Sequence, residues 1–592
     1  SISGRAATLD LPRVFPEPRI ALDQFDARVR WKVAGEQVSV ELQKVGFANA
    51  DIAGSVEGRY ATRPQSAGDI DISGNFQRGK VSEVWRYLPF VVGESVRELF
   101  RASLVDGQGS NIRLRMKGDL HEFPWAHDKN GEFDVSAAFS GARLHYAPQW
   151  PALHDIVGDL RFHGERMTIR ARRANFGALA VKDASAEIAD LTVHDDARLQ
   201  VKGQVDGATG DFLGFVNNSP VAAMINDVTR GVSASGAGTL ALALDLPLQH
   251  LHDTRVSGNY QFAGNELVAA PGLPTITAAG GRLEFTERSL GIRNATARIF
   301  GAPIEVSART EADGSTRIDL SGSAGIADLR RVVDTPWLDH LSGSTPWQAT
   351  VSMRGQNAVL SIESSLQGIT SSLPEPLNKP AGSAMPLRVE FGKLAGGAPG
   401  ADETHLTLDN LVDVRVQRRR DGERMVVERG GIGIRQAAAM AERGLVVNGT
   451  LDSLDLDAWR RLVVPGGDVT AGTSPPLQLS ALALRSGKLT AFGQHFTGFT
   501  IAATQAEGTW QARIDSKEMA GDLAWRASER GRLRARLKNL SLSEVRSTPE
   551  PLPARDAKHD ESLQELPGLD VIADNFSLRG KQLGKLELVA VN

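Results

Sequence analysis

The chain has 592 residues, of which 41% are hydrophobic and 23% charged, and its 67 basic and 71 acidic side chains give a formal net charge of -4. The length excludes a single ordinary core, which stops growing near ~250–300 residues, and the composition excludes a disordered chain. The balance of charge argues against a nucleic-acid partner, for which one strongly basic face is expected. The sequence has no cysteine, which excludes a thiol nucleophile and cysteine-ligated metals and suits a large cell-envelope protein.

Apolar residues recur at every second position in many segments. Ile112, Leu114 and Met116 alternate with basic residues, and a leucine series from 240 to 246 alternates with small or acidic residues. Such alternation predicts strands with one apolar and one solvated face. It also favours antiparallel pairing, because parallel strands beneath helices are apolar on both faces. The predicted fold class is therefore all-β, an elongated and twisted antiparallel groove with few helices.

Helical spacing of apolar residues is confined to short stretches. It occurs at residues 82–104, interrupted at Pro89, and at 211–228, interrupted at Pro220, with weaker examples at 327–341 and 456–462. These helices are expected as periodic inserts between sheet segments. They either cover apolar patches locally, the interpretation we favour, or gate the groove.

An internal repeat is indicated by two similar blocks. Gly158-Asp-Leu-Arg-Phe162 and Gly281-Arg-Leu-Glu-Phe285 begin 123 residues apart (281 − 158 = 123), and each precedes a second strand, a Phe-Gly pair and a third strand. A fixed period of this kind is typical of repeat architectures. We predict one continuous repeating segment over 1–592, with approximate units at 1–80, 81–208, 209–325, 326–470 and 471–592. The Pro-rich, charged stretch 547–567 is the expected linker or loop.

Neither end of the chain carries a targeting segment. The chain begins within an alternating strand pattern and without a signal peptide. It contains no run of 18 apolar residues, so no membrane-spanning helix is predicted. Both ends are expected to be boundaries within a longer protein whose anchor lies outside this sequence.

Signatures of catalysis are missing from the sequence. It contains no zinc-protease, P-loop, nucleophile-elbow or dinucleotide-binding motif, and Gly430 to Ile434 is a glycine-rich strand without the helix that a phosphate cradle needs. His250 and His252 could share one side of a strand but lack a third metal ligand, and Asp69 and Asp71 most simply form the wet face of a strand, with a glycosidase pair left open. We predict no catalytic, cofactor or metal site.

Basic residues cluster at 418–420, 170–173 and 526–536. They suit either contact with anionic lipid headgroups or the solvated face of strands, where arginine also discourages edge-to-edge aggregation. The second interpretation is favoured.

Several stretches resemble the YhdP family of AsmA-like envelope proteins. The similar segments are Trp85-Arg-Tyr-Leu-Pro89, Gly118-Asp-Leu-His-Glu-Phe-Pro-Trp125, Ser219-Pro220 with Gly236-Ala-Gly238, Leu246-Pro-Leu248, Ala520-Gly-Asp-Leu-Ala-Trp525, Leu537-Lys-Asn-Leu540, Leu566-Pro-Gly-Leu569 and Leu583-Gly-Lys-Leu586. Residues 390–470 match least. The resemblance implies a periplasmic protein anchored in the inner membrane, related to TamB and the bridge-like lipid-transfer proteins, that carries phospholipid toward the outer membrane and supports its permeability barrier.

An open apolar face of many strands would be a liability in water unless something filled it, and phospholipid acyl chains are a natural filling. The expected partners are therefore acyl chains, the two membranes through regions outside this sequence, and other envelope proteins. Alternatives are an assembly scaffold for outer-membrane proteins that works by strand pairing at a free edge, and an extracellular β-solenoid adhesin or hydrolase, which the long hairpins disfavour. The groove residues we predict are Val38, Val40, Leu42, Ile112, Leu114, Met116, Leu240, Leu242, Leu244, Leu283, Phe285, Val412, Val414, Leu533 and Leu537.

Overall fold

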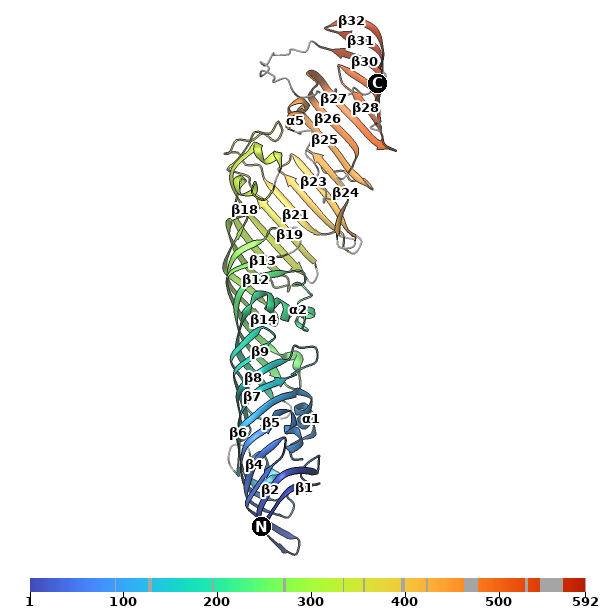
Figure 1. The fold of residues 1–592 in the computed structure, drawn as a ribbon. Coiled ribbons are helices and arrows are strands. Elements are labelled where there is room, and N and C mark those ends of the chain that lie inside the picture. Colours follow the sequence, from blue (N-terminus) through green and yellow to red (C-terminus); the bar gives the residue numbers. More distant parts are fainter. Residues whose placement is uncertain are drawn as a thin grey trace, which may run out of the picture. The chain divides into compact units, whose positions relative to one another are not determined.

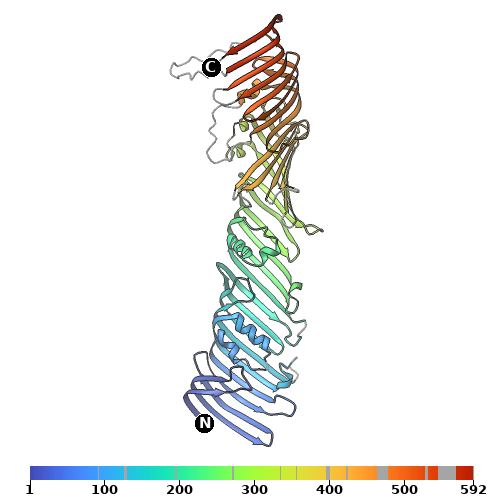
Figure 2. The same cartoon turned by 90° about the vertical axis from the view of Figure 1, so that its right-hand side faces the viewer.

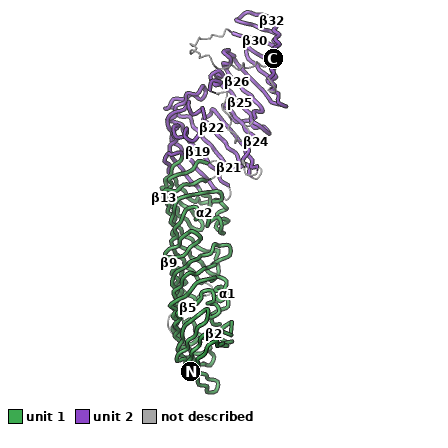
Figure 3. Tube along the Cα trace, viewed as in Figure 1, with its two compact units in different colours: residues 1–299, 306–316 green, residues 300–305, 317–592 purple. Residues whose placement is uncertain are grey.

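The computed structural model describes residues 1–90, 92–125, 130–193, 196–269, 273–333, 335–354, 357–394, 400–421, 424–462, 478–526, 531–543 and 568–590. It divides into two compact units, which are unit 1 (Ser1–Ile299 and Val306–Thr316) and unit 2 (Phe300–Glu305 and Arg317–Asn592) (Figure 3). All 32 strands are assigned to one hydrogen-bonded sheet. The predicted all-β class with few short helices is therefore confirmed. The division into five repeat units stays a prediction.

In unit 1 each strand from β1 to β14 pairs antiparallel with the next strand along the chain. The strands are β1 (Ile2–Asp10), β2 (Arg19–Ala34), β3 (Gln37–Ala48), β4 (Ile52–Ala61), β5 (Asp69–Lys80), β6 (Leu104–Asp119), β7 (Gly131–Leu144), β8 (Leu153–His163), β9 (Arg166–Phe176), β10 (Leu179–Ile188), β11 (Arg198–Ala208), β12 (Ser233–Pro247), β13 (Arg255–Val268), β14 (Ile276–Thr286) and β15 (Leu290–Ile299), and β16 (Ala302–Thr310) has residues in both units. Because each strand adds beside the last, unit 1 by itself is long and narrow (Figure 3).

Helices interrupt this meander at the two predicted places, 82–104 and 211–228. The helices of unit 1 are η1 (Val81–Tyr87), α1 (Glu94–Ser103), η2 (Leu120–Glu122), α2 (Thr209–Asn217), α3 (Val221–Met224) and η4 (Leu251–Asp253). Two of them, the short turns η2 and η4, were not predicted. The breaks fall at Pro89 and Pro220, since proline lacks the N–H that continues a helix. The inserts with α1 and α2 follow β5 and β11, which run in the same direction, so both inserts begin on the same side of the sheet. We call this side, which is formed by the ends of the strands, the helical edge. Two perpendicular views show α1 and α2 on the same side of unit 1 (Figures 1 and 2).

Unit 2 contains β17 (Thr316–Gly325), β18 (Leu341–Arg354), β19 (Asn357–Ser364), β20 (Ile369–Ser371), β21 (Leu387–Lys393), β22 (Asp402–Leu408), β23 (Val412–Asp421), β24 (Arg424–Ile434), β25 (Gly444–Asp455), β26 (Leu479–Ala491), β27 (Gln494–Ala506), β28 (Thr509–Asp515), β29 (Met519–Arg526), β30 (Arg532–Leu542), β31 (Gly568–Leu578) and β32 (Lys581–Ala590). Its helices are α4 (Ile326–Leu329), η5 (Pro336–His340) and α5 (Leu456–Leu462). The helix expected over 327–341 is thus split in two, with Pro336 in the first turn of η5. The predicted linker 547–567 lies outside the described residues.

Unit 2 departs from the antiparallel expectation at β24–β25, β25–β26 and β30–β31, which pair parallel. Parallel neighbours need a connection that returns across the sheet. Between β24 and β25 this connection runs directly over Gly431 and Gly433, where a methyl group would collide with the main chain of Ala439 and of Gln436. The glycine-rich run therefore has a packing reason. It lets the returning chain lie flat on the sheet.

The returning chain is held by side chains of the face it crosses. Asp413 on β23 accepts a hydrogen bond from the Ala438 amide at 3.0 Å, and Asn448 on β25 bonds both the amide of Ala439 and the carbonyl of Ala437. Asp413 and Gly433 lie on the opposite face from Val412 and Val414, because successive residues of a strand face opposite sides of the sheet. The crossover therefore does not cover the face that carries Val412 and Val414.

Candidate functional site, an apolar face on each unit

The predicted groove residues of unit 1 lie in rows that cross the strands. Leu114 on β6 is directly opposite Gly74 on β5 and Val135 on β7. The register continues this row from β1 to β12 through Ile2, Ala27, Val45, Val56, Gly74, Leu114, Val135, Phe162, Met167, Ile188, Leu199 and Leu246. Each of these positions is apolar or glycine, so they form one apolar line along unit 1.

The other predicted residues of unit 1 extend this apolar face on either side of the line. Their cross-strand partners are Val33 for Val38, Trp31 and Tyr60 for Val40, Val29 and Gly58 for Leu42, Phe76 for Ile112, Ile72 and Phe133 for Met116, Gly203 and Gly258 for Leu242, Val201 and Val256 for Leu244, and Gly258 and Leu290 for Phe285. Leu240 and Leu283 belong to a further row, made of Ala174, Val181, Val205, Leu240, Tyr260, Leu283 and Ile292. Tertiary pairing thus brings together residues that the sequence only marked as alternating.

Unit 2 has an apolar row of its own. Val414 lies opposite Leu406 and Ile432. The row runs through Ala349, Ile362, Val389, Leu406, Val414, Ile432, Val447, Leu482, Ala503, Ala512, Leu523, Ala535, Val571 and Leu588. Val412 pairs with Leu408 and Ile434, Leu533 with Trp525 and Leu569, and Leu537 with Gly521 and Ala573. The parallel pairs keep the row intact.

The exposure of these side chains indicates what covers them. All of the predicted groove residues are half-buried except Leu537, which is 5% exposed and packs with Ala535 and Ala573. Among the described residues, strands contact almost solely their hydrogen-bonded neighbours, and all belong to one sheet. The apolar face is therefore packed from the sides by its own strands and has no second strand layer above it in the described ranges.

Aromatic rings lie flat on this face where a neighbouring strand supplies glycine. A methyl group at Gly258 would collide with the ring of Phe285, and one at Gly238 with the ring of Tyr260. Tyr260 and Phe262 stack with centroids 5.8 Å apart. Without a Cβ beneath them, these rings lean over the backbone and stand less far out from the sheet. The large aromatic residues therefore project only a short distance from the sheet at these positions.

The opposite face is a lattice of ion pairs between neighbouring strands. Arg115 lies 2.6 Å from Asp71 and 3.1 Å from Glu132, and the hydrogen bond from the Arg115 guanidinium holds the pKa of Asp71 below its usual value. Lys182, 2.8 Å from Asp206, likewise lowers the pKa of that carboxyl. These ion pairs place charged side chains on the face opposite the apolar row of unit 1.

The basic clusters take part in this pairing. Arg172 lies 2.5 Å from Asp159 and Arg536 lies 2.8 Å from Asp570, both on this face. These two contacts support the interpretation of their clusters as solvated strand faces, since the guanidinium groups already have carboxylate partners. Arg418 differs, because it shares a face with Val412 and Val414 and donates there to Asp402, its cross-strand partner, at 2.8 and 3.0 Å.

The other sequence candidates are not assembled into a chemical site. His250 precedes the 3-10 turn η4 and His252 lies within it, so neither is on a strand as predicted. Their ring centroids are 5.9 Å apart. Within the described residues no three metal-ligating side chains come together. Asp71 is paired with arginine, which favours its ionised form and disfavours a role as a general acid.

A polar cavity at the helical edge had no signal in the sequence beyond the Trp85-Arg-Tyr87 motif. It measures about 300 Å³ and is lined by Glu17, Asp51, Arg86, Tyr87 and neighbours. Arg86 lies 2.8 Å from Glu17 and 2.9 Å from Asp51, and the Tyr87 hydroxyl donates to Asp51 at 3.2 Å. Burial raises the pKa of Tyr87. This network fastens η1 to the loop before β2 and to the turn between β3 and β4.

These features define a class of protein, an open β-sheet whose one face is apolar from strand to strand and whose other face is charged. The chain belongs to the YhdP family, because the sequence model described as YhdP protein matches residues 1–592. It is 24% identical over 338 residues to the intermembrane phospholipid transporter YhdP of Escherichia coli strain K12. That alignment covers 54% of this chain and 26% of the relative.

A search of solved structures gave no match to the chain. Across the described residues, none of the helices has the length and apolar character needed to cross a bilayer.

Proposed function

We propose that the apolar face of each unit carries the acyl chains of phospholipid along the sheet, from strand to strand, between the membranes of a bacterial envelope. The observation that carries the proposal is the row from Ile2 to Leu246, which presents an apolar or glycine position on each strand from β1 to β12. The protein is proposed to work in the periplasm without catalysis, anchored in the inner membrane by a segment outside this sequence and delivering lipid toward the outer membrane. The Escherichia coli relative is named an intermembrane phospholipid transporter, which supports the proposal.

The energetics of lipid in water explain why such a face is useful. A two-chain phospholipid has ~30 methylenes, and each costs ~0.8 kcal/mol to expose to water, which gives a barrier of ~24 kcal/mol for a free crossing. An apolar row with neighbours ~4.8 Å apart offers the chains a new contact before the old one is lost. The barrier then divides into small steps, and the charged headgroup stays in solvent.

The division of the two faces supports the same proposal. Half-buried apolar residues without a second strand layer cost stability in water, whereas the paired charges on the opposite face keep the sheet soluble. Acyl chains would complete the apolar face in the way that a second sheet completes a β-sandwich.

Two substitutions on adjacent residues of β12 test the proposal. Leu242→Asp puts a carboxylate on the apolar face, and the matched control Ala243→Asp puts it on the opposite face beside Lys202, its cross-strand partner. The whole chain is purified, extracted with organic solvent and examined by mass spectrometry. We expect diacyl phospholipid with the unsubstituted chain and with Ala243→Asp, and loss of most of it with Leu242→Asp.

Transfer of fluorescent phospholipid between donor and acceptor vesicles measures movement as well as binding. Leu114→Asp should stop transfer while leaving the circular dichroism of the sheet unchanged. A chain without bound lipid that accelerates no transfer would overturn the proposal and favour a scaffold that works by strand pairing. Melting of Leu114→Asp would show that this residue belongs to a closed core.

A further inference from the structure

Helix α2 lies along the apolar face of unit 1 and meets it at two aromatic contacts. The ring of Phe212 is 5.1 Å from that of Tyr260 on β13, and the ring of Phe215 is 5.2 Å from that of Phe176 at the end of β9. The two sheet residues belong to β13 and β9, so the aromatic contacts of α2 span the strands between them.

Polar contacts fix the first residue of this helix. The hydroxyl of Thr209 lies 2.7 Å from that of Tyr260, and the buried Asn265 amide is hydrogen-bonded to the same Thr209 hydroxyl. At its other end, Phe215 is 6.3 Å from the ring of Trp150. The helix is therefore seated at both ends and is part of the wall of unit 1.

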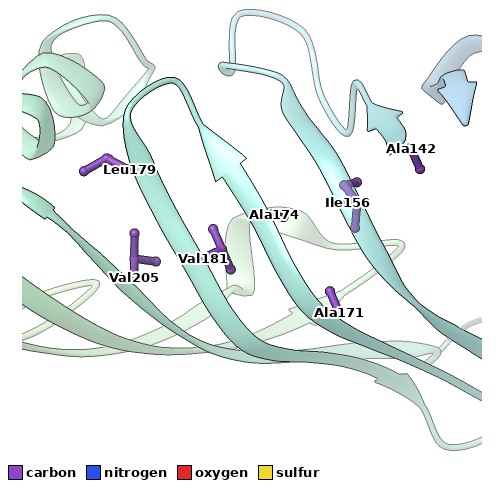
Figure 4. Close-up of a cluster of buried hydrophobic side chains, with 7 residues drawn as sticks. All are labelled: Ala142, Ile156, Ala171, Ala174, Leu179, Val181 and Val205. Carbon is purple, nitrogen blue, oxygen red and sulfur yellow. The ribbon is translucent and has the colours of Figure 1, made fainter. Parts of the chain in front are cut away.

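The apolar row beneath α2 is buried on three of its five strands. Ala174, Val181 and Val205 come from β9, β10 and β11 (Figure 4) and are 1%, 6% and 8% exposed. Phe212, Phe215 and Leu240 pack against the same cluster. We call Ala174, Val181, Val205, Leu240 and Tyr260 the covered row.

A second row on the same face, four residues away along β12, has no buried residue. It consists of Ile169, Ala186, Val201, Leu244 and Val256, which are paired in register from β9 to β13 and are all half-buried. We call these residues the open row. Val201 is four residues further than Val205 from the end of β11 at which the α2 insert begins, so the open row lies away from the helical edge.

We propose that acyl chains cross this part of unit 1 on the open row, and that Phe212 and Phe215 of α2 form the side wall that keeps them off the covered row. The inference rests on the proposed function and assigns the lipid path within it. Acyl chains need apolar contact that water or lipid can reach. The open row offers such contact, whereas the covered row already has its contacts from the helix.

Leu240 and Leu244 provide a matched pair for the test, since both are half-buried leucines on the same face of β12. A diazirine analogue of leucine is placed at either position in the whole chain loaded with phospholipid, which is then irradiated and analysed by mass spectrometry. We expect severalfold more lipid adduct at position 244 than at position 240.

Removal of the wall should change this ratio. In Phe212→Ala/Phe215→Ala, adducts should appear at position 240, with the circular dichroism of the sheet retained. Equal adducts at both positions in the unsubstituted chain, or an excess at 240, would overturn the open-row path while leaving lipid transport standing. No adduct at either position, together with no lipid in the purified chain, would remove the proposed function and this inference with it.

Discussion

The hydroxyl groups of Thr209 and Tyr260 lie 2.7 Å apart and join the first residue of α2 to β13. The ring of Tyr260 also carries the contact with Phe212. One residue of the sheet thus positions both the start of the helix and its first aromatic anchor, and the two contributions can be separated by removing the hydroxyl alone.

Tyr260→Phe should weaken the attachment of α2 to the sheet, because it removes the hydroxyl while keeping the ring contact with Phe212. One neutral hydrogen bond contributes about 1 kcal/mol, so the α2 amides should exchange hydrogen faster while the strands keep their protection. Hydrogen exchange read by mass spectrometry measures this. Tyr60→Phe, which removes a hydrogen bond to the Ala67 carbonyl in a different hairpin, should leave α2 unchanged, and identical α2 exchange in both variants would contradict the role given to Tyr260.

The Asp71–Arg115 pair predicts a pH dependence with a defined sign. Arg115 lowers the pKa of Asp71 in the folded chain, so the unfolded chain, with a pKa near ~3.9, binds more protons between the two values. The stabilisation is fully present above about pH 4 and is lost as the pH falls through the lowered folded pKa.

Asp71→Asn should therefore destabilise the chain most near neutral pH and have a shrinking effect in acid, as measured by urea denaturation over a pH series. Arg115→Gln tests the cause, since the double variant should lose less stability than the sum of the two single variants. A cost of Asp71→Asn that stays constant with pH would show that the carboxylate's charge is not responsible.

Two tryptophans with opposite environments give a sharp test of packing. Trp125 is 2% exposed, lies over Gly118 and Gly131, and donates its indole N–H to the Asp119 carbonyl at 2.7 Å. Trp125→Ala should cost about 3–5 kcal/mol through the cavity it leaves. Trp31, 70% exposed on β2, should cost no more than about 0.5 kcal/mol as Trp31→Ala. Thermal unfolding compares the two, and similar costs would contradict the packing described for Trp125.

The crossover over Gly433 predicts a backbone collision. Gly433→Ala places a methyl group against the main chain between Gln436 and Ala438 and should cost about 1–3 kcal/mol, as overpacking does. Gly46→Ala on β3 is the control, since the nearest atoms to its new methyl group are 3.9 and 4.0 Å away. Denaturant unfolding of both variants decides the point, and a fully stable Gly433→Ala would place the crossover elsewhere.

Much of the fold could be predicted from local pattern. The alternation around Leu114 and Val414 identified strands and the face that each presents, because the side-chain period of a strand is fixed at two. Proline marked the breaks at Pro89 and Pro220. The parallel pairs of unit 2 could not be predicted, since strand direction depends on where a connection crosses the sheet and the glycines at 431 and 433 carry no sign of what lies on them.

The sequence by itself determined that Leu240, Leu242 and Leu244 share one face of one strand, and it gave no means to tell them apart. Only the tertiary structure decided that Leu240 joins a row covered by α2 and that Leu244 joins a row left open. The physical reason is that periodicity is a property of neighbours along the chain, whereas cover is supplied by residues distant in sequence. Phe212 and Phe215 pack on Ala174, Val181 and Val205 only after the register of β9 to β11 has set these residues side by side.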